Sequence, residues 1–194
     1  MAATVTEIDV INKALLLLGD RQITDRTENS ERAKIMDAIY DNVRDKLLRE
    51  CQWNFATTQK SIAQDASYTV VFSEEFDAAH HLPADFLYMV RVEGDVQYKM
   101  LDNRILVNEV SDGAALKIEY VKRVTDMSVA DPFFVDALAY RLAYEACERI
   151  TQSNTKKSDL AAEYELSITR AKRHNGQEDF PQDTVEDEWL TARY

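Results

Sequence analysis

Two adjacent histidines, His80 and His81, follow Glu74, Glu75 and Asp77 and form the grouping in the sequence that most resembles a metal site. Metal sites need ligands that converge from defined spacings. Neighbouring residues of a strand point to opposite faces, so the two imidazoles would not share one ion. The spacing indicates no further ligand. We therefore expect no bound metal and interpret the grouping as polar loop residues.

Other chemistries lack their usual sequence signatures. The four glycines, Gly19, Gly94, Gly113 and Gly176, are too scattered for a phosphate-binding loop, in which clustered glycines let backbone amides reach a phosphate. Neither a GxSxG nor an HExxH motif occurs. The many carboxylates form no pair typical of glycoside hydrolysis. We therefore expect no enzyme activity and no cofactor.

The charge balance bears on the choice of partner. The chain has 194 residues, with 23 Lys and Arg against 35 Asp and Glu, and its formal net charge is −12. Binding nucleic acid by its phosphates requires Lys and Arg, so the composition argues against that role. It does not exclude a DNA duplex that passes close by without being held.

One basic run departs from this acidic composition. It consists of Lys156, Lys157, Arg170, Lys172 and Arg173. The last three would lie in the final turn of a helix and complement its dipole. The alternative is a patch for an acidic partner surface or a phosphate.

The two cysteines, Cys51 and Cys147, lie far apart in helix-like segments, which indicates a reducing compartment rather than a disulfide framework. The apolar run 14–18 follows acidic residues and lacks the basic region of a secretory signal. No run approaches the roughly 18 apolar residues of a membrane span. We therefore expect a soluble protein that is made in a cytoplasm and needs no membrane.

Helical periodicity marks the beginning of the chain. Apolar residues recur at helical spacing over residues 5–18. Thr4 and Glu7 have the spacing of a capping box, and Gly19 suits the left-handed position after a helix.

Three further helices are predicted from caps and apolar stripes. The second runs from a cap at Asn29 or Ser30 to about Cys51, and the third follows the Asp131-Pro132 pair and ends near Thr151. The fourth covers 157–173 and ends before Asn175-Gly176. The charged face of the second helix either meets water or, in a ring, a neighbouring subunit; it comprises Glu31, Arg32, Lys34, Asp37, Asp41, Arg44, Asp45 and Arg49.

Short runs rich in β-branched and aromatic residues separate the two pairs of helices. They predict strands at 68–72, 87–92, 96–100, 104–107 and 115–121. The gaps between them are too short for parallel crossovers, so the pairing should be antiparallel.

These elements predict an α+β fold. We expect an antiparallel bundle of about four helices with an inserted small antiparallel β lobe and an extended C-terminal tail. The expected boundaries are 1–56 and 126–174 for the two halves of the bundle, 57–125 for the β lobe and 175–194 for the tail.

The predicted tail is strongly acidic. Six acids and no Lys or Arg lie within residues 177–188. Such a segment buries too little surface to fold alone. It is either a frayed terminus or, as we favour, a segment that becomes ordered on a partner through its large apolar side chains, which are Phe180, Trp189, Leu190 and Tyr194.

Three stretches in this order resemble one known family. They are residues 11–19 (INKALLLLG), 49–56 (RECQWNFA) and 82–92 (LPADFLYMVRV). The chain thereby resembles the tail tubular protein A family, the head-to-tail adaptors or gatekeepers of short-tailed, podovirus-type bacteriophages.

The stretches also have a physical reading of their own. Trp53 and Phe55 would anchor the chain where it leaves the second helix. Pro83 fixes φ before the strand at 87–92, and Asp85 could accept hydrogen bonds from backbone amides in that turn.

The resemblance implies a structural protein of the virion. In this family, twelve copies form a ring at the head–tail junction, between the portal protein and a tail nozzle of the tail tubular protein B type. Double-stranded DNA passes through the ring without sequence-specific binding, and no enzyme activity, metal or nucleotide is implied. The C-terminal segment of such adaptors contacts the portal, which makes Phe180, Trp189, Leu190 and Tyr194 the expected portal-binding residues here.

Three alternatives remain open from the sequence. The nearest is a head-completion or stopper protein of another tailed-phage type. The second is a soluble, non-enzymatic interaction protein with an acidic partner-binding tail. The third is an enzyme whose site the sequence does not reveal.

Overall fold

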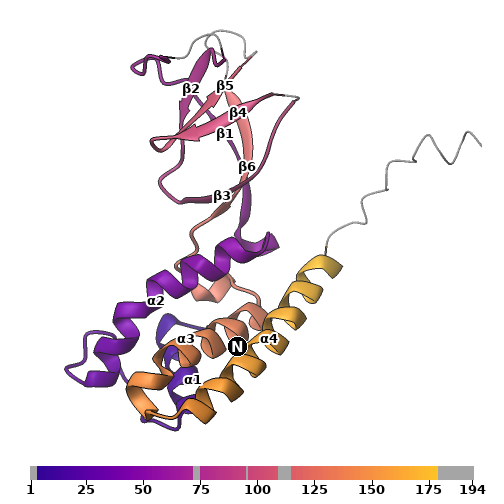
Figure 1. Ribbon diagram of the computed structural model, residues 1–194. Coiled ribbons are helices and arrows are strands. Elements are labelled where there is room, and N and C mark those ends of the chain that lie inside the picture. The colour runs from indigo at the N-terminus through magenta and orange to yellow at the C-terminus, as the bar shows by residue number, and fades with distance from the viewer. Residues whose placement is uncertain (1–3, 72–74, 95, 109–114, 179–194) are drawn as a thin grey trace, which may run out of the picture.

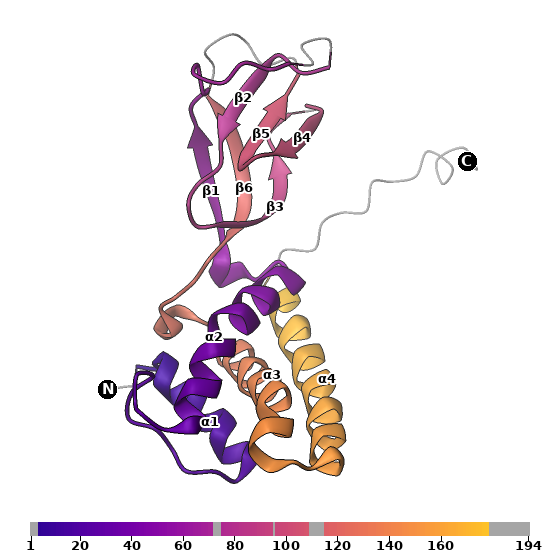
Figure 2. The same ribbon diagram turned by 60° about the vertical axis from the view of Figure 1, so that its left-hand side comes forward.

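A computed structural model of the chain describes residues 4–71, 75–94, 96–108 and 115–178. Within this part it contains four α-helices and two three-stranded antiparallel sheets, which confirms the predicted α+β class. The helices gather at one end of the molecule and the strands at the other (Figures 1 and 2). None of the described helices is long and apolar enough to cross a membrane.

Helix α1 (Glu7–Leu18) begins two residues later than the sequence analysis predicted. Thr6 is the N-cap, and its hydroxyl accepts a hydrogen bond from the Asp9 amide, while the Asp9 carboxylate accepts one from the Thr6 amide at 2.8 Å. The capping box is therefore formed by Thr6 and Asp9, and the prediction of Thr4 and Glu7 is wrong. The prediction failed because it looked for Glu or Gln at the third helical position, where this helix has an aspartate. Gly19 follows the helix with a φ of 75°, as expected.

The caps of α2 and α3 agree with the sequence analysis. Helix α2 (Glu31–Glu50) begins after Ser30, whose hydroxyl accepts from the Ala33 amide. Helix α3 (Pro132–Thr151) begins after Asp131, whose carboxylate accepts from the two following amides beyond the proline.

Helix α4 (Asn154–Gln177) is longer than predicted at both ends. Ser153 caps it by accepting a hydrogen bond from the Lys156 amide. The helix also continues through Asn175 and Gly176, so the helix end predicted there is wrong. The side chain of Asn175 is bonded to the start of the strand region, and this tertiary contact stabilises a last turn that propensity alone disfavours.

The four helices share one apolar core. Helix α3 packs against each of the other three, and the largest fully buried side chains of this core include Tyr40, Trp53 and Phe134. The buried face of α4 comprises Leu160, Tyr164, Ser167, Ile168 and Ala171.

The strands form two sheets in the orders β1-β6-β3 and β2-β5-β4. Four of them confirm predicted strands: β3 (Phe86–Val92), β4 (Tyr98–Leu101), β5 (Arg104–Val107) and β6 (Leu116–Lys122). Every pairing is antiparallel, as expected. Asp102 and Asn103 form the β4–β5 turn with φ values of 51° and 57°, a conformation that Asn and Asp tolerate.

Two strands were missed and one was wrongly predicted. β1 (Thr57–Ile62) is polar on both faces, and β2 (Ala78–His81) is short, so neither shows the apolar alternation of a half-buried strand. The strand predicted at 68–72 is wrong over its described residues, 68–71, which are not in a strand. The Tyr68 ring instead lies 4.6 Å from the Arg104 guanidinium.

Candidate functional site

The junction between helices and strands is held by three aromatic rings. Trp53 and Phe55 follow α2, and both meet the Phe134 ring of α3, with centroids 5.1 and 5.0 Å apart in edge-on geometry. Trp53 is only 1% exposed, and its indole N–H donates to the Leu47 carbonyl at 2.9 Å. The most distinctive part of the family-like stretch at 49–56 thus packs within the helical core and fixes the direction in which the chain enters β1.

A set of hydrogen bonds ties the end of α4 to the same junction. The Asn54 amide donates to Asn175 Oδ1 at 2.8 Å, and the Asn54 side chain donates to the Asn175 carbonyl at 3.1 Å. Asn175 Nδ2 donates to the Gln52 carbonyl at 2.7 Å. The sequence does not predict the hydrogen bonds of Asn175, because their partners lie more than a hundred residues away along the chain.

An ion-pair network around the buried Arg44 links α2 to the connector after β6. The Arg44 side chain is 4% exposed and lies 2.9 Å from carboxylate oxygens of both Asp41 and Asp45. Asp45 also pairs with Arg123 at 2.8 Å. Part of the charged face that we expected to meet water or a neighbouring subunit is therefore used within the chain.

Pro83 and Asp85 hold the entry to β3. Pro83 is buried, and its carbonyl accepts from the Phe86 amide at 3.0 Å. Within the described residues, the Asp85 carboxylate accepts the Tyr120 hydroxyl at 3.0 Å rather than a backbone amide. Burial, together with this carboxylate, raises the pKa of Tyr120 to about 12. Both residues therefore have structural roles in this turn.

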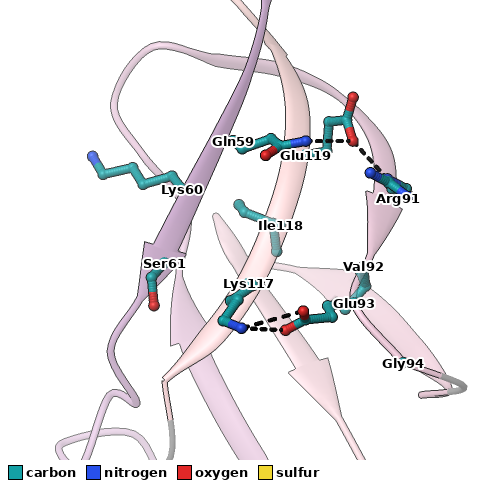
Figure 3. Close-up of a pocket in the computed structure, with 10 residues that line it drawn as sticks. All are labelled: Gln59, Lys60, Ser61, Arg91, Val92, Glu93, Gly94, Lys117, Ile118 and Glu119. Atoms are coloured by element: carbon teal, nitrogen blue, oxygen red, sulfur yellow. Dashed lines mark hydrogen bonds and ion pairs between the residues drawn. The ribbon is translucent and has the colours of Figure 1, made fainter.

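The outer face of the β1-β6-β3 sheet carries a shallow groove of about 390 Å³ (Figure 3). Two ion pairs cross it, Lys117 with Glu93 at 3.0 Å and Arg91 with Glu119 at 2.6 Å. Gln59 of β1 adds a hydrogen bond to Glu119. Four of the five charged side chains in the lining are thus paired with one another, and Lys60 is exposed without an ion-pair partner among the described residues.

A smaller groove of about 120 Å³ lies between α3 and α4. At its end the Phe133 and His174 rings stack, with centroids 4.0 Å apart and planes 11° from parallel. The groove is lined by Phe133, Asp136, Tyr140, Glu163, Ser167 and Arg170.

The basic run of the sequence divides into bonded and unbonded members. Lys156 donates to the Leu18 carbonyl at 2.6 Å, Lys157 pairs with Glu148 at 2.8 Å, and Lys172 pairs with Glu50. Arg170 and Arg173 are exposed and form no ion pair with any described residue.

His80 and His81 lie in β2, so their interpretation as polar loop residues is wrong, because a short strand with few apolar residues shows no clear pattern. The two side chains point in different directions, as strand geometry predicts. His80 is fully buried, with Nδ1 3.2 Å from the Ile62 carbonyl, whereas His81 is exposed. No group of three or more His, Cys, Asp or Glu within the described ranges could hold a metal. Cys51 and Cys147 are both thiols in the structure.

No protein-family model matches this sequence, and no curated protein matches it significantly.

The four side chains expected to bind a portal, Phe180, Trp189, Leu190 and Tyr194, lie outside the described residues. Of the four structural anchors, Trp53 and Phe55 lie between α2 and β1, and Pro83 and Asp85 lie just before β3. Among the described residues the best-defined feature is therefore the junction of helices and strands, which positions two lobes and the start of the acidic segment.

Proposed function

We propose that this chain is the head-to-tail adaptor of a short-tailed bacteriophage. Twelve copies would form a ring below the portal and above the tail nozzle, extend the DNA channel, and reside at the head–tail junction of the virion. The observation that carries the proposal is the ordered set of stretches at 11–19, 49–56 and 82–92. The second of these covers the link from α2 to β1, and the third covers β3 and its entry.

The arrangement of the elements is compatible with this role. The helices and strands lie at opposite ends of an elongated molecule (Figure 1). A ring of such subunits could present its helical bundle to the portal and its β lobe to the nozzle. Neighbouring copies would then meet through the same pair of unlike surfaces around the ring.

The tail, residues 175–194 in the sequence-based division, supplies a mechanism for ordered assembly. Large aromatic side chains dominate interfaces because they remove large areas from water. Phe180, Trp189, Leu190 and Tyr194 would bind the portal, and the ordering of the segment would be coupled to that binding. Adaptor docking would then follow completion of the portal and DNA packaging.

The net charge of −12 suits the proposed channel. Acidic side chains facing a lumen would repel the DNA backbone, so a duplex would slide without sticking. Changing such residues to Lys should slow DNA ejection.

Truncation after Glu178 tests the portal contact while leaving α4 intact. We expect the truncated chain to lose portal binding in size-exclusion chromatography with light scattering. The quadruple variant F180A/W189A/L190A/Y194A should lose it too, without any change of charge. V71A removes an 81% exposed apolar side chain elsewhere and serves as the control. Unchanged binding by the truncated chain would refute the role of the tail.

A further inference from the structure

The solvent-facing side of α4 carries a basic and apolar surface. Arg170 and Arg173 are exposed there without an ion-pair partner among the described residues, and Leu166 is 53% exposed. Residues 166–177 contain three Lys or Arg and no Asp or Glu. This half of the helix therefore presents an excess of positive charge.

The groove between α3 and α4 borders this surface. Arg170 lines it, and Phe133, which stacks on His174, is 37% exposed at its end. The acidic groups in the groove are Asp136, which is already bonded to Lys13, and Glu163. The surface thus combines cations with exposed apolar contact area, a combination that suits an acidic segment with large apolar side chains.

The chain itself supplies a segment of that chemistry directly after α4. Residues 179–194 contain one Arg and five acids, which are Asp179, Asp183, Glu186, Asp187 and Glu188. The same segment carries Phe180, Trp189, Leu190 and Tyr194. Its charge is opposite to that of the α4 surface, and it begins one residue after the last described residue, Glu178.

The length of the segment matches the length of the surface. If the chain reverses around Pro181, an extended run from Asp183 to Glu188 covers about 17 Å at ~3.3 Å per residue. The helix from Gln177 back to Leu166 also spans about 17 Å at ~1.5 Å per residue. The acids would then lie beside Arg173 and Arg170, and Trp189 and Leu190 would reach Leu166.

We propose that in the free protein residues 179–194 fold back onto this α4 surface of the same chain. The contact would shield the apolar side chains of the segment until a partner displaces it. The shielding step rests on the proposed function, because it assumes that the same segment binds the portal. The fold-back contact itself does not depend on that assumption.

Trp189 gives a direct readout, since the other tryptophan, Trp53, is buried. The variant R170E/R173E should make Trp189 at least about twofold more accessible to acrylamide quenching, and high salt should act in the same direction in the wild type. The control R21E/R149E changes the charge equally at two exposed residues outside the α4 surface and should leave quenching unchanged. Circular dichroism melts check that all variants are folded.

Three outcomes would overturn the proposal. They are equal quenching in the wild type and R170E/R173E, an equal increase in the R21E/R149E control, or protection of Trp189 that grows with protein concentration, which would mean that a second copy supplies the surface.

A parallel assay with a purified portal ring separates the two proposals. If quenching shows no contact but truncation after Glu178 still abolishes portal binding, the fold-back contact fails and the adaptor role stands. If R170E/R173E exposes Trp189 but truncation leaves portal binding intact, the fold-back contact stands and the role of the segment in portal binding fails.

Discussion

Asn175 in the last turn of α4 is hydrogen bonded to Asn54, which lies three residues before the start of β1. The Asn54 amide donates to Asn175 Oδ1 at 2.8 Å, and the Asn54 side chain donates to the Asn175 carbonyl at 3.1 Å. The end of α4 is thereby fixed to the point where the β strands begin. Any force on the segment after α4 acts on a helix end that is bonded to the base of the β lobe.

Replacing Asn175 by Ala should loosen this junction. The change removes two side-chain hydrogen bonds, so we expect it to lower the free energy of unfolding by about 1–2 kcal/mol. Hydrogen exchange should also accelerate at the Asn54 amide. Asn12 offers a matched control because its side chain exchanges two hydrogen bonds with Ile23 inside the helical part. N12A should lower stability without accelerating exchange at Asn54, and equal exchange in both variants would contradict the role of Asn175.

Replacing Arg44 by Ala should destabilise the chain strongly. Arg44 is almost fully buried and pairs with Asp41 and Asp45, which keep Arg26 and Arg123 as second partners. Its replacement removes two ion pairs and the packing of a buried side chain, although neither carboxylate is left without a cation. We expect a loss of about 2 kcal/mol in urea unfolding, mainly from lost packing. The exposed Arg49, on the same helix, gives the control, and R49A should change stability by less than ~0.5 kcal/mol. A loss for R44A as small as that for R49A would show that the network contributes little.

The ion pair of Asp65 and Arg104 should make stability depend on pH in acid. The hydrogen bond from Ser67 and that from Arg104, which lies 2.9 Å away, lower the pKa of Asp65 to about 2. Because the folded pKa lies below the unfolded value of about 4, this contribution is complete above pH 4 and is lost as the pH falls toward 2. Side-chain NMR titration should place the Asp65 midpoint near 2. A midpoint near 4 would contradict the pairing, and D65N should lack this part of the acid dependence.

Tyr120 should produce the opposite dependence in alkali. Its pKa is raised to about 12 by burial and by Asp85. A raised pKa favours the neutral phenol in the folded state, so the contribution is complete below pH 10 and is lost as the pH rises toward 12. Burial also raises the pKa values of Tyr40 and Tyr164, so the wild type should contain several tyrosines that ionise late. The difference between the ultraviolet titrations of the wild type and Y120F should isolate the late transition of Tyr120. The exposed Tyr98, changed to Phe, is the control. Loss of the late transition in Y98F but not in Y120F would refute the assignment.

The local parts of the fold could be predicted from the sequence. Ser30 and Asp131 cap helices because their side chains bond amides a few residues away, and such signals are contained in short stretches. The turn at Asp102 and Asn103 is also a local signal, because Asp and Asn tolerate the positive φ values that the turn requires. β1 could not be found because Gln59, Lys60 and Ser61 are all polar.

The parts that depend on distant residues could not be predicted. In the sequence, Arg44 belongs to a charged helix face that is expected to be exposed. The structure shows that Asp45 pairs both with Arg44 and with the distant Arg123, so part of this face contacts the rest of the chain. Asn175 resembles a helix-ending residue until its partner Asn54 is seen. The portal-binding residues proposed from the sequence lie outside the described chain, so their role remains a prediction.

The mass of the complex formed with a portal ring tests the adaptor proposal most directly. The full-length chain would be mixed with the purified portal encoded in the same genome and measured by size-exclusion chromatography with light scattering. The proposal predicts that the portal peak gains the mass of twelve chains, while the chain alone does not form this ring. A portal peak of unchanged mass, or a stoichiometry other than twelve, would contradict it.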